Sequence, residues 1–371
     1  MKIKHCIITL FNLLVFFSCT NKKYIETDSI IVHFKQKVDT LNISSLFSEM
    51  KTIPLSNEIT IGEIERLIID NNNNLYILDS HLSGTISKYS LNGDLISYIN
   101  IENDARFDLN GITDMYFDSP HLKLNVLGQR IIKLDTNLNV IDRINLPYKS
   151  NSHLKLNDNY IMFNNFLEDK VQYDYYVFNQ NNSKISNKFL EFSNEYPFHY
   201  KANAVFQYNN NYYHFSKAFN DTIYRIDEQL RLNPYITVDF SNHKLPKNSL
   251  NKINNALEMY QFLKQTDFST LMGEIHFVKD DLLISTAHSE GKTQNILINV
   301  SSREAKIFSH FKDDLISEAN FYNILYSDER YLVFTLSAEL LYDQLVDTDN
   351  KFLKDFKLTP NQNPYLFLIK K

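Results

Sequence analysis

Polar side chains recur where short apolar segments begin, and they recur along the whole chain. Carboxylate and amide oxygens can ligate a hard cation such as calcium, and together with a histidine they can position a water for hydrolysis or elimination. The side chains concerned are Glu63, Asp114, Asn203, Glu274, His276 and Asn320. If the segments converge on one axis, these groups could hold calcium or another ligand, or they could simply solvate a water-filled channel. The residues alone leave both interpretations open.

Two other stretches could contribute to binding. "ENDARFDLNGITD", residues 102–114, carries Arg106 ahead of one of these segments. "EYPFHYKAN", residues 195–203, concentrates aromatic, basic and acidic groups around His199. It could line a recognition pocket, or it could be a loop that packs between neighbouring parts of the fold.

Several classes of chemistry lack their signature. The chain has no G-x-S-x-G elbow, no H-E-x-x-H pair and no tryptophan. Its histidines are dispersed, and most are expected at the surface or in loops. The two cysteines, Cys6 and Cys19, lie in the first 19 residues, so neither a disulfide-stapled domain nor thiol catalysis is expected. A net charge of −6 without a basic stripe argues against nucleic-acid binding.

The elements that would position these groups form an internal repeat. One short strand recurs as "NLYILD", "LKLNVLG", "NYIMFNN", "NYYHFS", "DLLIST" and "RYLVFT". Each copy follows another candidate strand and a polar turn, and a third strand comes after it. Six units of three or four strands predict an all-β, six-bladed β-propeller, in which each small sheet buries its faces against its neighbours. The polar groups listed first would then begin the strands next to the axis.

Insertions and ring closure complete the expected architecture. Apolar residues at helical spacing predict two short helical insertions, at about 245–266 and 337–357. The last blade ends with the chain and lacks an outer strand. Residues 30–36 and 51–55 have strand composition and precede the first blade. We expect one or both of them to pair with the last blade and close the ring.

The N-terminus has the features of an export signal. Lys2 and Lys4 precede an apolar run from Cys6 to Phe17 that is too short to span a membrane. The end of this run, "VFFSC" at residues 15–19, resembles a bacterial lipobox. This resemblance implies a lipoprotein signal peptide at 1–18, a lipid on Cys19, a tether at 19–29 and the propeller at 30–371. The expected location is the cell envelope, at the periplasmic or outer face of the outer membrane.

The stretch "TIPLSNEITIGEIERLIIDNNNNLYILDS", residues 52–80, together with "ISKYSLNGDLISYI", resembles the six-bladed β-propeller lipoproteins of bacteria with large glycan-uptake systems. The similarity to NHL-type propellers is looser. Together these features imply a monomeric, non-enzymatic protein that binds a protein partner or a glycan or peptide ligand. The alternative is a hydrolase or lyase similar to propeller lactonases, which use a comparable ring of Glu, Asn and Asp around a channel cation.

Overall fold

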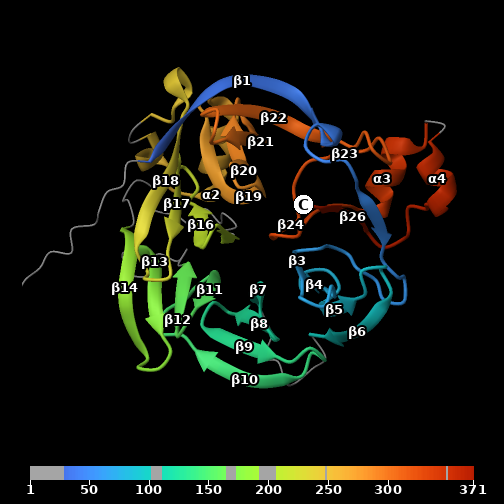
Figure 1. The fold of residues 1–371 in the computed structure, drawn as a ribbon, viewed down its shortest axis with the longest axis horizontal. Coiled ribbons are helices and arrows are strands. Elements are labelled where there is room, and N and C mark those ends of the chain that lie inside the picture. The colour runs from blue at the N-terminus through green and yellow to red at the C-terminus, as the bar shows by residue number, and fades with distance from the viewer. Residues whose placement is uncertain (1–28, 102–110, 164–172, 192–205, 247–248, 348–349) are drawn as a thin grey trace, which may run out of the picture.

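The repeated apolar segments form six small antiparallel blades around a central axis (Figure 1). Four blades are separate sheets, and the other two are joined by a parallel strand into one larger sheet. The computed structural model describes residues 29–101, 111–163, 173–191, 206–246, 249–347 and 350–371. Within this part the fold is the expected six-bladed β-propeller. No described helix is long and apolar enough to cross a membrane.

Each blade has four strands, and consecutive strands are paired from the axis outwards. Blade I contains β3 (Arg66–Ile69), β4 (Leu75–Asp79), β5 (Thr85–Tyr89) and β6 (Leu95–Asn100). Blade II contains β7 (Ile112–Asp118), β8 (His121–Val126), β9 (Arg130–Leu134) and β10 (Val140–Asn145). Blade III contains β11 (Ser152–Leu156), β12 (Asn159–Phe163), β13 (Tyr173–Asn179) and β14 (Lys184–Glu191). Blade IV contains β15 (Gln207–Asn209), β16 (Tyr212–Ser216), β17 (Thr222–Ile226) and β18 (Leu232–Asp239). Blade V contains β19 (Thr270–Lys279), β20 (Leu282–Ser289), β21 (Lys292–Asn299) and β22 (Glu304–Lys312). A short strand, β23 (Asn320–Phe321), pairs with β22.

Blade VI joins the two ends of the described chain. Its strands are β24 (Tyr326–Ser327), β25 (Tyr331–Leu336), β26 (Tyr365–Lys370) and β2 (Lys51–Pro54). Strand β2 pairs antiparallel with β26, with Ile53 opposite Leu366, so the segment at 51–55 supplies the outer strand as expected. The ring is therefore closed by a strand that comes before blade I in the sequence.

The earlier segment, at 30–36, does not pair with the last blade. It belongs to β1 (Ile30–Asn42), which runs parallel first to β18 and then to β22 (Figure 1). Val32 of β1 is fully buried in the apolar cluster between blades IV and V. Strand β1 therefore bridges the outer edges of blades IV and V, because their unpaired edges lie beside each other and accept a parallel strand.

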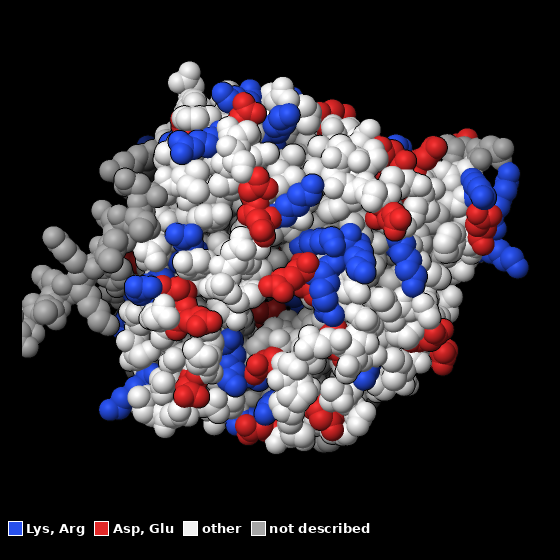
Figure 2. Space-filling model, viewed as in Figure 1, with Lys and Arg blue, Asp and Glu red and all other residues white. Residues whose placement is uncertain are grey.

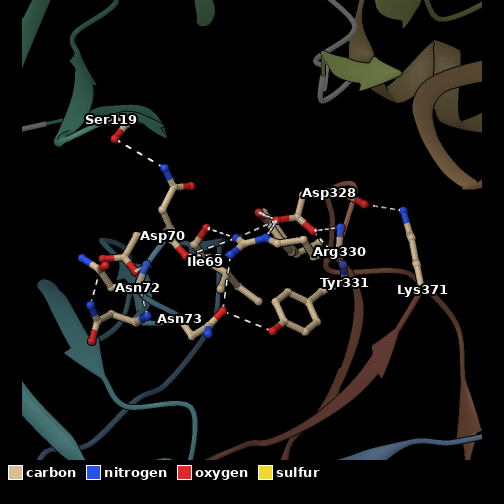
Figure 3. A network of polar contacts seen from close by, with 12 residues as sticks. Ile69, Asp70, Asn72, Asn73, Ser119, Asp328, Arg330, Tyr331 and Lys371 are labelled. Atoms are coloured by element: carbon tan, nitrogen blue, oxygen red, sulfur yellow. Dashed lines mark hydrogen bonds and ion pairs between the residues drawn. The ribbon is translucent and has the colours of Figure 1, made fainter. Parts of the chain in front are cut away.

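A second contact closes the ring at the turn of blade VI. Arg330 donates hydrogen bonds to the carbonyl oxygens of Ile69 and Asp70 in blade I and also pairs with Asp328 (Figure 3). The distances from Arg330 Nη2 are 3.1, 3.1 and 3.0 Å respectively. The hairpin turn of the last blade is thus bound to the hairpin turn of the first.

The hydrophobic core is distributed over the junctions between blades. In the described residues one cluster of buried apolar side chains lies at each of the six junctions. The cluster between blades VI and I includes Ile53 of β2 together with Leu67 and Leu366. A separate cluster lies under the insertion that carries α2. Each blade is therefore stabilised chiefly by its neighbours, which is the property that requires a closed ring.

Few of the tight turns depend on glycine. Asp70 accepts hydrogen bonds from the backbone N–H groups of Asn72 and Asn74 and from the side chain of Asn74, while Asn73 takes φ of +61°. Asp135 and Asp227 hold equivalent turns, in which leucines occupy the left-handed position. In each of these turns the aspartate side chain thus stabilises a left-handed backbone conformation that glycine often adopts in β-turns.

The two expected helical insertions are present. The first contains two 3₁₀ turns, η2 (Ser241–His243) and η3 (Ser249–Lys252), followed by α2 (Ala256–Gln265). The second contains α3 (Ala338–Leu345) and α4 (Lys351–Phe356), and a third 3₁₀ turn, η1 (Ile43–Ser45), lies between β1 and β2. Asn255 and Ser337 cap α2 and α3 by accepting the backbone N–H groups of Glu258 and Leu340.

Candidate functional site

The innermost strands β3, β7, β11, β15, β19 and β24 lie around the axis of the ring (Figure 1). Three cavities of about 540, 570 and 760 Å³ follow one another along it, because each shares lining residues with the next. We call them the entry, middle and exit cavities in that order. Figure 2 shows one hollowed face at the centre of the ring, with acidic and basic side chains around the hollow.

The entry cavity is lined by acidic side chains that lie before β3 and within β19. Glu63 is exposed there, and its backbone N–H donates to Asp79 Oδ2 at 3.1 Å. Glu274 lies between the entry and middle cavities and accepts a hydrogen bond from Thr286 at 3.4 Å. Arg66 lines both of these cavities as well.

An ion pair joins the inner strands of blades I and II. Arg66 Nε lies 2.9 Å from Asp114 Oδ1, and the Asp114 side chain is only 10% exposed. The backbone N–H of Met115 donates to the same carboxylate oxygen at 2.9 Å. This arginine is therefore neutralised by a carboxylate at the wall of the middle cavity.

A hydrogen-bonded chain crosses three blades at the middle cavity. Ser327 Oγ of blade VI donates to Gln207 Oε1 of blade IV at 2.9 Å. Nδ1 of His276, from blade V, lies 2.9 Å from the same serine oxygen. All three side chains are at least 94% buried, and all line the middle cavity. Nε2 of His276 is buried and has no hydrogen-bond partner among the described residues.

Two further polar groups without a partner lie at the wall on blades II and III. His153 is 3% exposed, and neither of its ring nitrogens has a partner among the described residues. The ring of Tyr116 packs edge-on against it with centroids 4.3 Å apart, and the buried hydroxyl of Tyr116 is also unpaired within the described chain. Buried polar atoms are normally satisfied, and the three side chains that lack a partner among the described residues all line the middle cavity.

These wall groups are uncharged near neutral pH. Burial lowers the pKa of His276 to about 3, and the positive charges of Lys371 and Arg66 lower it further. Burial also holds the pKa of His153 well below its usual value, with a smaller effect of Lys123. Burial raises the pKa of the Tyr116 hydroxyl well above its usual value. The wall therefore offers neutral donors and acceptors.

The structure brings together only part of the predicted set. Glu63 and Glu274 line the entry cavity, and Asp114, Glu274 and His276 line the middle cavity. Asn320 instead lies in β23 at the edge of blade V, where its backbone N–H donates to Gln344 of α3 at 2.7 Å. The predicted residues Cys19, Arg106, His199 and Asn203 lie outside the described residues.

No metal site can be assembled from the acids and histidines that the structure describes. Among these residues no group of three or more His, Cys, Asp or Glu side chains could hold a metal ion. Asp114 is paired with Arg66, and the buried nitrogen of His276 has no neighbouring carboxylate partner. The described residues therefore provide no set of acidic and histidine ligands for the expected calcium ion.

Sequence reasoning did not identify Gln207, Ser327, Tyr116 and His153 as channel residues. Four of the nine described histidines are buried, namely His153, His214, His276 and His288. The available signal was period-2 alternation within the inner strands, since Asp114 and Tyr116 are two residues apart and point to the same side. Alternation alone could not show which of the two strand faces meets the channel.

Comparisons with known proteins agree with this architecture. A family model described as a domain of unknown function, DUF4934, matches residues 29–370. Among solved structures, a predicted exported protein from Bacteroides fragilis has a TM-score of 0.71 and 16% identity, and the match covers 92% of this chain and 100% of that one. A member of the DUF4221 family from Bacteroides vulgatus has a TM-score of 0.51 and 11% identity, with 88% and 97% covered. At these identities the similarity shows the fold alone. No curated protein matches the sequence.

Proposed function

This chain belongs to the DUF4934 family, and we propose that it is a binding protein that takes a small polar ligand into its central channel. One observation carries the proposal. The middle cavity, of about 570 Å³, is lined by His276, His153 and Tyr116, whose buried polar atoms have no partner among the described residues. Cavities of this size and character are typical of small-molecule sites.

A non-enzymatic role fits the hydrogen bonds around Ser327. A serine nucleophile needs a neighbouring base that accepts its proton, but Ser327 donates to the Gln207 amide. The alternative, a hydrolase or lyase with calcium in the channel, needs several oxygen ligands, and no three described Asp, Glu, His or Cys side chains gather to hold a metal ion. Titration of the purified protein with Ca²⁺ in a calorimeter tests this alternative, and heat of binding at one site per chain would favour it.

The setting that we propose for this binding protein is the bacterial cell envelope, with a lipid on Cys19 as the anchor. The lipobox-like end of the apolar run supports it. We expect mass spectrometry of the purified protein to find a diacylated N-terminal Cys19. We also expect Cys19→Ala to release the protein from membranes. An unmodified residue 19, or a Cys19→Ala variant that stays on the membrane, would contradict the anchor.

The channel itself is tested by filling it. Leu154 is half-buried and lines the middle cavity, so Leu154→Trp places an indole in the space without removing a polar group. The matched control is Ile96→Trp, because Ile96 is 50% exposed on the outer strand of blade I. Thermal unfolding is followed with neutral sugars, sugar acids, amino sugars, amino acids and dipeptides. A ligand that binds the folded protein raises its Tm. We expect at least one class to stabilise the parent and the Ile96→Trp variant but not Leu154→Trp. If no class stabilises the parent protein, the proposal fails.

A further inference from the structure

The hydrogen bonds at Ser327 determine which nitrogen of His276 carries the proton. A serine hydroxyl has a single proton, and Ser327 donates it to Gln207 Oε1. Nδ1 of His276 must therefore donate to Ser327 Oγ, at 2.9 Å. A neutral imidazole has one N–H, so Nε2 presents a lone pair. Nε2 is buried and has no partner among the described residues, and His276 lines the middle cavity, so the donor that Nε2 lacks can come from a molecule in that cavity.

The charges around the middle cavity do not favour an anion. Its basic side chains, apart from the neutral histidines, are Arg66 and Arg330, and both are paired, with Asp114 and Asp328 respectively. Of the acids, Glu274 is shared with the entry cavity, and Glu329 is exposed and shared with the exit cavity. The described wall between the two mouths therefore presents no unneutralised positive charge to a carboxylate or phosphate.

Six aromatic side chains also line the middle cavity. The middle cavity is lined by Tyr116, Phe117, Phe206, Tyr208, Tyr213 and Tyr326. Aromatic faces pack against apolar C–H surfaces, and tyrosine adds a polar tip. Neutral hydrogen-bonding groups among aromatic faces suit a molecule that carries both hydroxyl groups and C–H faces.

We propose that the middle cavity binds an uncharged polyhydroxyl ligand of the size of a mono- or disaccharide, one of whose hydroxyl groups donates to Nε2 of His276. This inference rests on the proposed function of the channel as a binding site. The Tyr116 hydroxyl and His153 lie on blades II and III, whereas His276 lies on blade V. The ligand therefore has hydrogen-bonding groups on more than one of its sides.

The test uses three sugars that share one ring and differ in charge. Glucose is neutral, glucosamine is positive and glucuronate is negative at neutral pH. Maltose and cellobiose extend the neutral set to disaccharides. Binding to the full-length processed protein is measured by saturation-transfer NMR and calorimetry at pH 5, 7 and 8. We expect neutral sugars to bind more tightly than either charged analogue. We also expect their affinity to stay constant over this pH range, since His276 remains neutral throughout.

The variant His276→Asn removes the acceptor while keeping the bond to Ser327. The asparagine amide lies near the position of Nδ1 and can still donate to Ser327 Oγ. Loss of one neutral hydrogen bond to the ligand should weaken binding about tenfold. The matched control is His288→Asn. His288 is 1% exposed on the neighbouring strand β20, also has an unpartnered Nε2 within the described chain, and lines none of the three cavities. The control should lose comparable stability and keep the affinity of the parent.

Each outcome decides between two claims. If glucosamine or glucuronate binds more tightly than the neutral sugars and Leu154→Trp blocks it, the ligand class is overturned but the channel remains a binding site. If a neutral sugar binds equally to the parent and to His276→Asn, the contact with Nε2 is overturned. If none of the five sugars binds, the polyhydroxyl class is overturned. The proposed function then depends on the broader set of ligands tested against Leu154→Trp.

Discussion

Arg330 donates two hydrogen bonds to the carbonyl oxygen of Asp70, from Nη1 at 3.2 Å and from Nη2 at 3.1 Å (Figure 3). The two residues are 260 positions apart in the sequence and belong to the turns of blades VI and I. Asp70 is fully buried, and its carboxylate holds the turn of blade I through Asn72 and Asn74. The Arg330 guanidinium therefore binds a turn that the Asp70 carboxylate already stabilises. This contact lies at the junction of blades VI and I, where the ring closes.

Arg330→Ala should destabilise the propeller by ~1–2 kcal/mol, because carbonyl groups at a partly buried junction lose charged donors. The expected loss of stability is small because the Arg330 side chain is 36% exposed and its charge is partly screened by solvent. Urea unfolding measures the effect. Arg231→Ala is the matched control, since Arg231 is 65% exposed and pairs with Asp227 within its own turn. Arg231→Ala should lower the free energy of unfolding by no more than about 0.5 kcal/mol. Equal losses in the two variants would show that Arg330 has no special role in closure.

Gly93 should tolerate alanine much less well than Gly111. Both glycines have positive φ, +90° and +100°, so an alanine is strained at either position. A Cβ at Gly93 would also overlap the carbonyl oxygen of Pro54 in β2, whereas at Gly111 the only contact among the described residues is with the side chain of Leu127, 3.1 Å away. We expect Gly93→Ala to lower the free energy of unfolding by ~1–3 kcal/mol more than Gly111→Ala does. A similar loss for both, measured by chemical denaturation, would mean that β2 moves aside without cost.

Buried histidines should make the protein less stable in mild acid. Burial lowers the pKa of His214 to about 4, and Arg225 contributes to the shift. An unfolded histidine titrates near 6.5. Between these values the unfolded state binds more protons, so the stabilisation is complete above pH 6.5 and is lost as the pH falls towards 4. The change is ~1.4 kcal/mol per pH unit for this group.

His214→Phe should reduce that slope. The imidazole ring packs between Tyr235 and Phe277, with centroids 5.0 and 4.8 Å away, so phenylalanine can occupy the same space. The exposed His243 provides the control substitution, His243→Phe. Stability is measured by urea unfolding at half-unit steps from pH 4 to pH 7.5. If the slope of His214→Phe matched that of the parent, His214 would not be neutral in the folded state.

Local features of the sequence predicted most of the fold. "NLYILD" and the strands around it alternate or concentrate apolar residues, and their polar turns mark where each strand ends. These signals lie within about ten residues, which is why blade I could be recognised. The partner of β1 could not be predicted in the same way. Ile30 and Val32 indicate a strand, but the parallel pairing with β18 and β22 depends on edges that only the assembled ring places side by side.

The candidate site was predictable only in part, for a related reason. His276 and Asp114 were found because they were expected to begin inner strands, although His276 lies in the interior of β19. Asn320 was predicted at the channel because the apolar segment that follows it was expected to be an innermost strand. In the structure the chain forms two short strands there, and Phe321 is buried in the core beside blade V. Ser327 then takes the channel position, where the contacts with His276 and Gln207 come from three separate blades.

The proton on His276 provides the last prediction, and it is independent of any ligand. We expect ¹⁵N NMR to show His276 as the Nδ1–H tautomer, with Nε2 unprotonated, from pH 5 to pH 8. The Gln207–Ser327 bond requires this tautomer, and the lowered pKa of the buried imidazole prevents a second proton from binding. Ser327→Ala removes the acceptor that holds Nδ1–H, so the ring should become a mixture of tautomers. Ser289→Ala is a control at a buried serine on blade V whose partner is another serine, Ser269, and it should leave His276 unchanged. Observation of the Nε2–H tautomer in the parent protein would mean that Ser327 donates to His276. Nε2 of His276 would then carry the proton and could not accept a hydrogen bond from a hydroxyl group of the ligand.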